Sequence, residues 1–593
     1  MTQDELLSRL NAFEWGDFEC KRAQRGVPDD AYKTVSAFAN TAGGWLVFGV
    51  SERERDLEIT GVEEPDKVPG AFLSTLRAGQ KLNRVITPES RAYEVDGKHI
   101  FAFHIPEAAR ADKPVYLKGD PRQSYIRRGS GDEQCNQREL EGFLRDAAQD
   151  RYDGVALTDI PADTCFDDAT VKWYQAQFGR RNPEHSESTD PIDFLLNWNF
   201  IVEQGGEMRP TRAGVLLFGK GRYVRQILPR PVLDYQRIDA PFELWSPEER
   251  WHDRYVFEEN IFQTWQGLVA RYMRIAEHPF SLDPATLRRN DDPPDYVAFR
   301  EAAINLLIHQ DYGEHGLKAT IKLFTDRTIF WNPGDAFATE AELFEPTEKE
   351  VRNPSIVKAF RRIGLSDQAG TGIRAIFRNW NQLGRVPPTL RNDKARKEFE
   401  LVLVKQPLVT DAMRRFRESI GVNLNPEQAA VLALALGRAD EPRISLTDIR
   451  ALGVNTAQQA KQLADFLVRQ QLLEPVGDTS YQVRDTVRQR FVQSTEQVTP
   501  QVTPHVAPQV SPQVIGLLRQ LSGKGEMTRQ ELMDIAGLKD RKHFSEAYLQ
   551  PALDAGLLEM TIPDKPQSSK QRYRLTPEGQ TRAGQATADR SET

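Results

Sequence analysis

The spacing of apolar residues switches between helical and strand-like periods within the first fifty residues of the chain. A first helix is predicted at the capping box Thr2-x-x-Glu5, with three leucines on its inner side. Residues 17–21 alternate apolar and polar positions, as a half-buried strand does, and residues 29–42 return to helical spacing. Residues 45–50 form a short apolar run that is typical of a buried strand. We therefore predict a β-α-β unit whose two strands are parallel.

A second region of regular spacing lies in the middle of the chain. Residues 299–308 are predicted to form a helix with an apolar side, residues 327–331 a strand, and residues 399–404 a closing strand. Further on, residues 445–450 and 455–463 predict two short helices. The elements indicate a mixed α and β domain followed by a smaller, mainly helical one.

Four-residue units of the type Gln-Val-Thr-Pro repeat between residues 497 and 514. A proline at every fourth position blocks both a helix and a central strand. This segment is therefore predicted to be an extended, semi-stiff tether between folded modules.

The composition is that of an ordinary protein of several domains, with 593 residues, 39% apolar and 28% charged. No run approaches the roughly 18 apolar residues that a membrane helix requires, so no membrane partner is expected. The three cysteines, Cys20, Cys135 and Cys165, argue against a disulfide framework or a zinc site and favour a reducing cytoplasm. The net charge of -8 gives no general attraction to nucleic acid, so such binding must use local basic patches.

Glu301 and Asn305 lie four residues apart on the predicted central helix, so they share one of its faces. The amide oxygen of Asn305 can hold a hard cation, and the Glu301 carboxylate can orient or deprotonate a water molecule. A glycine-rich turn, Gly370-Thr371-Gly372, follows and could bring backbone close to a phosphate. These features predict a Mg-nucleotide site, unless the two helical residues merely face solvent.

Together with Asn332-Pro-Gly334 after the predicted strand, this set resembles the nucleotide-binding boxes of the GHKL superfamily (gyrase, Hsp90, histidine kinases, MutL). The resemblance implies Mg-ATP as cofactor, with Asn305, Asn332, Gly334 and the glycine turn as binding residues and Glu301 as a catalytic residue. The family's first glycine box begins with Asp, which reads the adenine amine. Asn332 takes that position here, and an amide offers a donor as well as an acceptor.

His309 and Asp311 follow the same helix. They are interpreted either as catalytic groups or as a structural pair at the helix end. The middle segments of the chain resemble bacterial proteins described as RecG-like helicases or transcriptional regulators. No Gly-x4-Gly-Lys-Ser/Thr loop occurs in the sequence, so a motor of the P-loop kind is not expected.

The N-terminal pattern is Glu14-x4-Glu19-x-Lys21, then Ala-Phe-Ala-Asn-Thr-Ala-Gly-Gly-Trp at 37–45, then Phe-Gly-Val at 48–50. It resembles the Schlafen/AlbA-like domain, and the resemblance covers residues 10 to 135. Glu19 and Lys21 share one face of the predicted strand.

In Schlafen nucleases a cluster of three acids binds a divalent ion and cleaves RNA or DNA. The resemblance implies Glu14 and Glu19 as two of these acids, with the third position held by Ser51 or by Glu52. Mg or Mn at Glu14, Glu19 and Glu52 could activate water, while Lys21 stabilises phosphate charge. The alternative is a Glu19–Lys21 pair in a domain that only binds nucleic acid.

Two C-terminal segments resemble winged helices. The second of them carries basic residues at the start of its predicted recognition helix and in its wing, which suits contacts to phosphates. These residues are Arg541, Lys542, Lys570, Arg572 and Arg574. The alternative is a winged helix that docks onto protein.

The fold class is therefore multidomain α+β. The predicted parts are a Schlafen/AlbA-like α/β domain (1–145), a mixed connector (146–285), a GHKL-like α/β sandwich (286–410), a winged helix (420–488), a linker (489–514), a second winged helix (515–582) and a tail (583–593).

The leading interpretation is a cytoplasmic regulator, in transcriptional control or antiphage defence, that couples nucleic-acid binding to ATP. One alternative is a metal-dependent nuclease gated by nucleotide. Another is an oligomeric scaffold with a degenerate nucleotide pocket. The expected partners are DNA or RNA, a nucleotide and further copies of the chain.

Overall fold

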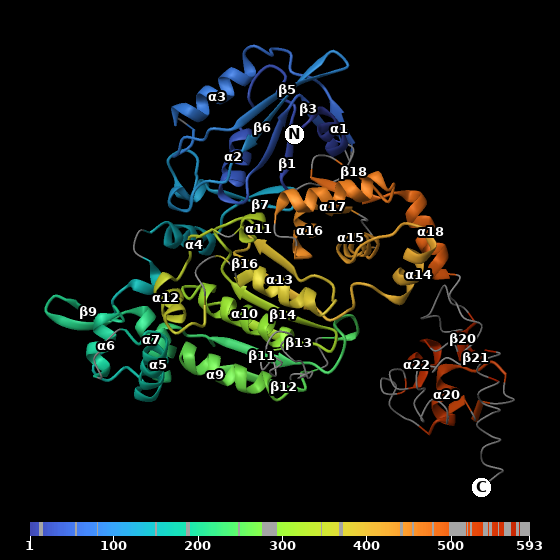
Figure 1. Cartoon of the computed structure of the whole chain (residues 1–593). Coiled ribbons are helices and arrows are strands. Elements are labelled where there is room, and N and C mark those ends of the chain that lie inside the picture. The colour runs from blue at the N-terminus through green and yellow to red at the C-terminus, as the bar shows by residue number, and fades with distance from the viewer. Residues whose placement is uncertain are drawn as a thin grey trace, which may run out of the picture. The chain divides into compact units, whose positions relative to one another are not determined.

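Figure 1 shows a computed structural model of the whole chain. The described residues form two compact units, 1–494 and 495–593. The structure describes all residues apart from 11–15, 54–55, 80, 149–150, 185–189, 247–249, 276–292, 346, 367–369, 371, 439–442, 454–455, 477–478, 497–516, 519, 522–524, 538–543, 545–547, 555–556, 562–570, 577–579 and 581–593.

The first domain is built on a small mixed sheet. Its elements are α1 Gln3–Leu10, β1 Phe18–Lys21, α2 Ala31–Asn40, β2 Gly44–Phe48, β3 Val50–Arg53, β4 Asp56–Ile59, α3 Val68–Ala78, β5 Glu89–Val95, β6 Lys98–Ile105, η1 Arg110–Asp112, η2 Pro121–Gln123, β7 Tyr125–Arg128, β8 Gly131–Gln134 and α4 Gln137–Ala147. The main sheet has the order β1-β2-β6-β5. β1 pairs in parallel with β2, with Glu19 opposite Leu46, which confirms the predicted parallel pair. The strand predicted at 45–50 is divided, because Gly49 adopts a φ of +93° between β2 and β3.

The buried side-chain amide of Asn40 hydrogen-bonds to two other segments of this domain. The side chain of Asn40, at the end of α2, is fully buried. Its Nδ2 donates to the carbonyls of Val115 at 2.8 Å and Tyr125 at 2.9 Å, and its Oδ1 accepts from the N–H of Val115 at 2.7 Å. Asn40 therefore joins α2 to two segments far along the chain.

The second domain contains a six-stranded sheet with the order β12-β11-β13-β14-β16-β15. The elements of this region are η3 Tyr152–Gly154, α5 Asp168–Arg181, α6 Pro191–Asn197, β9 Ile201–Gln204, β10 Glu207–Pro210, α7 Arg212–Phe218, α8 Gly221–Ile227, β11 Leu233–Arg237, η4 Phe242–Leu244, β12 Asp253–Phe257, α9 Ile261–Tyr272, α10 Pro294–His309, β13 Thr320–Leu323, β14 Arg327–Pro333, α11 Glu340–Leu343, α12 Pro354–Arg362, α13 Gly372–Gln382, β15 Thr389–Asp393 and β16 Glu398–Val404. β11 runs parallel to β13, and the other neighbouring strands are antiparallel.

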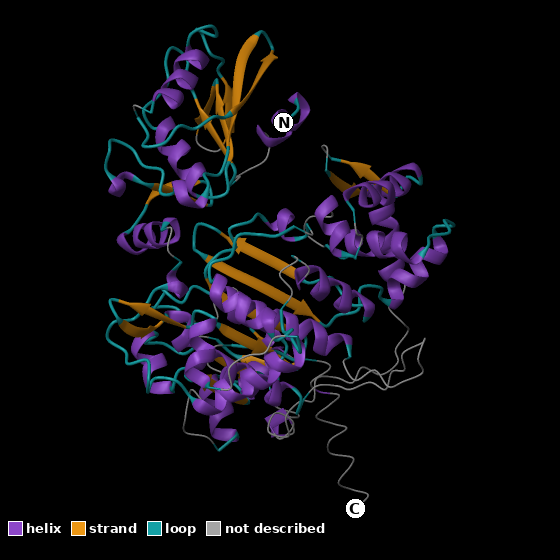
Figure 2. Ribbon diagram, turned by 60° about the vertical axis from the view of Figure 1, so that its left-hand side comes forward, coloured by secondary structure: helices purple, strands orange, loops and turns teal. Residues whose placement is uncertain are grey.

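The boundary predicted at 285/286 passes through this sheet. β11 and β12 come from the segment predicted as a connector, yet they pair with strands beyond it. One hydrophobic core includes side chains from both segments. α10 packs between α13 and β14, and its Ala303 and Leu307 are fully buried. Figure 2 shows helices packed along the strands of the sheet.

A smaller module completes the first unit. Its elements are α14 Asp411–Ser419, α15 Pro426–Leu436, β17 Arg443–Ser445, α16 Leu446–Ala451, α17 Ala457–Arg469, β18 Leu473–Pro475, β19 Ser480–Val483 and α18 Asp485–Glu496. The three strands form one sheet with the order β17-β19-β18. α18 occupies the first residues of the segment predicted as a linker, which shortens that linker.

The second unit has its own hydrophobic core. Its described elements are α20 Arg529–Ile535, α22 Gln550–Asp554, β20 Leu558–Met560 and β21 Tyr573–Leu575. β20 and β21 form an antiparallel pair. In the parts of both units that the structure describes, no helix combines the length and apolar character that a membrane span needs.

The role of Asn40 leads to a stability prediction. Asn40→Ala leaves two carbonyls and one N–H without their buried partner, and each such loss costs about 1–3 kcal/mol. We expect the variant to unfold at a clearly lower temperature in scanning calorimetry, while Ser74→Ala, at an exposed helix position, leaves the trace unchanged. An unaltered unfolding temperature in Asn40→Ala would show that water replaces the amide.

Candidate functional site

The inner face of α10 carries three polar residues at intervals of one helical turn. Glu301, Asn305 and His309 all line one pocket, as their i, i+4, i+8 spacing requires. The opposite side of the helix is apolar and buried in the core. α10 thus presents a row of polar groups from a rigid support.

The pocket has a volume of about 150 Å³. Its apolar walls include Leu306, Phe330, Val357, Ile373, Phe399 and Leu401. Six of the residues predicted from the nucleotide motifs surround it: Glu301, Asn305, Asn332, Gly334, Gly370 and Gly372. Thr371, the seventh, lies outside the described residues. The structure therefore gathers around one cavity motifs that lie up to 71 residues apart in sequence (301 to 372).

Two of the glycines are required by their surroundings. Gly334 has a φ of +101°, and a Cβ there would lie 2.9 Å from the backbone N of Asp311. A Cβ on Gly372 would lie 3.3 Å from the Nδ2 of Asn305. A side chain at either position would strain the backbone or press on the pocket wall.

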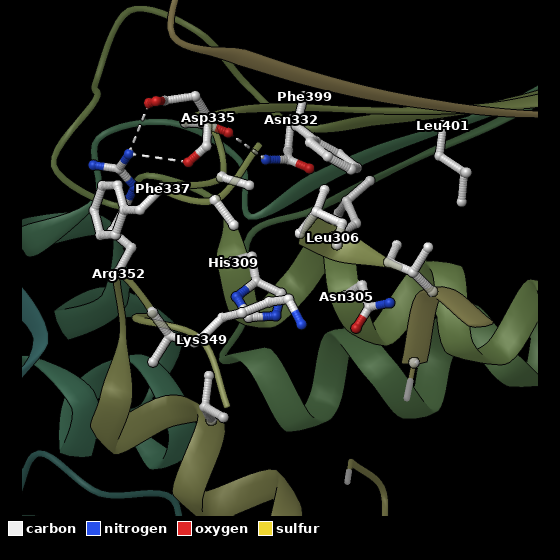
Figure 3. A pocket seen from close by; sticks show the side chains of 18 of the residues that line it. Asn305, Leu306, His309, Asn332, Asp335, Phe337, Lys349, Arg352, Phe399 and Leu401 are labelled. Carbon is white, nitrogen blue, oxygen red and sulfur yellow. Dashed lines mark hydrogen bonds and ion pairs between the residues drawn. The ribbon is translucent and has the colours of Figure 1, made fainter. Parts of the chain in front are cut away.

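Asn332 lies at the end of β14 with only 4% of its surface exposed. Its Nδ2 donates to the carbonyls of Pro333 and Gly334, both at 3.2 Å. Figure 3 shows the side chain held in this way beside Asp335. The amide donor is therefore engaged by backbone, and the group that Asn332 can offer to a ligand is its acceptor, Oδ1.

His309 is half-buried at the pocket wall, with many protein atoms around its ring (Figure 3). Burial, together with the charge of Arg352, lowers the pKa of His309 to about 4. The imidazole is therefore neutral near pH 7. Asp311 instead pairs with Arg145 at 2.5 Å and accepts from the N–H of Gly313 at 2.9 Å, which fits the structural interpretation of that residue.

Four charged pocket residues were missed by the sequence analysis: Asp335, Lys349, Glu350 and Arg352. Asp335 and Arg352 form an ion pair at 3.0 Å, and Lys349 donates to the carbonyls of Glu345 and Thr347. Asp335 could have been found from the sequence, because it follows the Asn-Pro-Gly element directly. Arg352 and Lys349 carry no spacing that marks them.

In the N-terminal domain, Glu19 is paired with two cations. One carboxylate oxygen lies 2.8 Å from Lys21 and the other 2.9 Å from Arg127, and Lys21 also pairs with Asp30 at 3.0 Å. Burial opposes the charge of Lys21, but Glu19 and Asp30 raise its pKa.

The other predicted acids do not complete a cluster in the part of the domain that can be described. Glu52 lies on β3 with its side chain exposed, next to Ser51, and Glu14 lies outside the described residues. Among the described residues, no three His, Cys, Asp or Glu side chains gather closely enough to hold a metal ion.

In the second unit, Arg574 pairs with Glu559 at 2.5 Å and with Glu526 at 3.3 Å. Arg572 donates to the carbonyl of Glu526 at 3.2 Å. The positive charge of the predicted wing is thus partly matched by neighbouring acids. Arg541, Lys542 and Lys570 lie outside the described residues.

Four families match separate segments of the chain. Residues 14–136 match Schlafen, AlbA_2, and residues 316–403 match "Putative ATP-dependent DNA helicase recG C-terminal". Residues 512–576 match the C-terminal domain of Filamentation induced by cAMP protein Fic-like, and residues 141–234 match a domain of unknown function. The first two agree with the resemblances seen in the sequence, and the Fic-like match was not anticipated.

Among solved structures, the DIP2311 protein of Corynebacterium diphtheriae is 19% identical over 94% of both chains, with a TM-score of 0.36. The N-terminal domain of a "putative ATP-dependent DNA helicase RecG-related protein" of Nitrosomonas europaea is 33% identical over 23% of this chain and 95% of that one, with a TM-score of 0.19. A Fic family protein of Desulfovibrio desulfuricans G20 is 17% identical over 54% of this chain and 95% of that one, with a TM-score of 0.11. No curated protein is similar enough to count as a relative.

The lowered pKa of His309 predicts a pH effect on stability. Its ordinary pKa is 6.5 and its folded pKa about 4, so the unfolded chain binds the proton more readily. The contribution is fully present above pH 6.5 and is lost as the pH falls towards 4. At pH 5 the loss is about 2 kcal/mol relative to pH 8. We expect the unfolding temperature of His309→Gln to fall less than that of the wild type between pH 8 and pH 5. If the two proteins lose unfolding temperature equally over this range, the imidazole of His309 is not held neutral in the folded protein.

Proposed function

The chain carries a Schlafen AlbA_2 domain and a domain of the recG C-terminal family, and on that basis we propose that it is a nucleic-acid-binding regulator controlled by a nucleotide. The observation that supports this most is the row of Glu301, Asn305 and His309 on one helix face, opposite Asn332 and the glycine turn, around one pocket. Such a protein would serve transcriptional control or antiphage defence.

The cavity of about 150 Å³ is smaller than the roughly 300–1,000 Å³ of most ligand sites. We therefore assign the apolar interior to the base of the nucleotide and the mouth, near Gly370 and Gly372, to the phosphates. Asn332, with its donor engaged, would accept a hydrogen bond from an exocyclic amine, which favours adenine.

The donor set at the mouth fits a magnesium ion. Mg²⁺ takes oxygen ligands and is usually held by one or two protein groups together with phosphates, and the amide oxygen of Asn305 can be such a ligand. Bound there, the ion would neutralise phosphate charge. Glu301, one turn away, would orient a water molecule towards the phosphates and take up its proton.

For the N-terminal domain, we propose nucleic-acid binding rather than cleavage. A metal-binding carboxylate must offer its oxygens to the ion, whereas both oxygens of Glu19 contact cations of the protein itself. Lys21 and Arg127 offset the negative charge of Glu19, which a divalent ion would do in the nuclease interpretation.

The nucleotide assignment is tested by calorimetry with Mg-ATP and Mg-GTP. Asn305→Ala should remove the Mg-dependent part of ATP binding. Asn379→Ala is the matched control, because its amide donates to the carbonyl of Ala375 on α13, away from the pocket. Glu301→Ala should still bind ATP, but any turnover should fall roughly 10²–10⁴-fold, as expected for a lost general base. Equal ATP affinity in wild type and Asn305→Ala would refute the metal assignment.

The N-terminal assignment is tested by adding Mn²⁺. If the domain only binds nucleic acid, Mn²⁺ leaves the unfolding temperature unchanged and labelled RNA and DNA are bound but not cut. Binding should weaken steeply with salt, because phosphate contacts release counterions. Stabilisation by Mn²⁺ together with cutting of the labelled RNA or DNA in the wild type, both absent from Glu14→Gln/Glu19→Gln, would establish the nuclease interpretation instead.

A further inference from the structure

Arg352 is part of the wall of the nucleotide pocket, and only 8% of the residue is exposed. It pairs with Asp146, with Asp335 at 3.0 Å and with Asp311 at 3.9 Å. Burial opposes its charge, but the three carboxylates raise its pKa above the ordinary value. Asp311 and Asp335 belong to the nucleotide-binding domain, whereas Asp146 lies near the end of α4, a helix that begins where the Schlafen AlbA_2 match ends and reaches into the segment 141–234 matched by a domain of unknown function.

Lys397 closes the same network from the turn between β15 and β16. Its Nζ lies 3.1 Å from Asp146 and 3.5 Å from Asp335. Burial disfavours the charged form of Asp146, but Arg352 and Lys397 together lower its pKa to about 2. Removing one member of a buried ion pair is costly because it leaves an uncompensated charge. Asp146 therefore holds Arg352 in the pocket wall, although it lines only the adjoining cavity itself.

A second set of ion pairs joins the same two domains. Arg110, in the Schlafen AlbA_2 domain, pairs with the pocket residue Glu350 at 2.9 Å. Glu107 of the same domain pairs with Lys394 at 2.6 Å. Residues of both domains line an adjoining cavity of about 500 Å³, which shares Lys349 and Glu350 with the nucleotide pocket.

α4 is itself fastened to the Schlafen AlbA_2 domain. Glu139, in its first turn, pairs with Arg128 of β7, and Arg110 donates to the carbonyl of Ala148 at 3.2 Å just beyond its last turn. A movement of the N-terminal domain would consequently pull Asp146 away from Arg352 and Lys397.

Building on the proposed nucleotide function, we propose that the N-terminal part of the chain completes the nucleotide site, with Asp146 as the positioning residue. Asp146 holds Arg352 and Lys397 against Asp335, which fixes the segment after the Asn-Pro-Gly element. The site has its binding geometry only while α4 is docked. Linkage is reciprocal, so the nucleotide must stabilise that docking by the same factor.

The first test compares nucleotide affinity in the full-length chain. Asp146→Asn keeps the shape of the side chain and removes its charge, so Mg-ATP affinity should fall within the range of about 5- to 150-fold that such coupling covers. Asp146→Glu should recover part of the loss. Asp132→Asn is the matched control, because Asp132 also pairs with a buried arginine, Arg127, but inside the N-terminal domain. Equal affinity in Asp146→Asn and wild type would overturn the proposal.

A second variant covers the case in which Asp146→Asn does not fold. Arg110→Met breaks the partly exposed contact with Glu350 and keeps most of the side-chain volume, so the fold should survive. Affinity should fall in this variant too, by a smaller factor. An Arg110→Met protein that binds like wild type, beside an unfolded Asp146→Asn, would count against the proposal.

The reciprocal effect is measured by hydrogen exchange. Mg-ATP should slow exchange in residues 137–147 of the wild type and leave the exchange of Asn305→Ala unchanged. If the wild type binds no nucleotide, the proposed function fails. If it binds nucleotide with no change in α4, only the coupling fails.

Discussion

The ion pairs around Arg352 are the constraint on which the arrangement of the first unit depends. One guanidinium brings together the end of α4, the turn after α10 and the segment that follows β14 and the Asn-Pro-Gly element. The local charges balance, because Arg145, Arg352 and Lys397 face Asp146, Asp311 and Asp335. Charges so deeply enclosed are tolerated only when each is matched, so a shift of one element disturbs all the others. Two members of this group, Asp335 and Arg352, line the pocket.

Much of the local structure could be predicted from the sequence. The capping box at Thr2 and Glu5 forms as expected, with bonds of 3.2 and 3.3 Å, and the parallel pairing of β1 with β2 follows from the helix between them. The common position of Glu301 and Asn305 at the pocket was accessible for the same reason, since a spacing of four on a helix fixes a common face. Rules of this kind relate residues that are close in sequence, so they predict helix caps, helix faces and the pairing of strands joined by a short connection.

The rest depends on pairings between distant segments, for which the sequence has no local sign. Arg352 meets Asp146 across 206 residues (146 to 352), and β11 joins β13 across the predicted domain boundary. Arg127 pairs with Glu19 from 108 residues away (19 to 127). This pairing gives a carboxylate that the sequence marks as a possible metal ligand a protein cation as its partner. In each case a residue of ordinary appearance acquires its role from a partner that only the tertiary structure provides.

The fixed amide of Asn332 bears on which residues can stand at this position of the pocket. With its NH₂ group masked by two backbone carbonyls, the side chain shows a ligand the same face that an aspartate would show. An aspartate at this position would add a negative charge to the pocket and would set a carboxylate oxygen against the carbonyls of Pro333 and Gly334, to which Asn332 donates. The amide therefore gives the pocket a neutral acceptor and at the same time ties the turn at Gly334 to the end of β14.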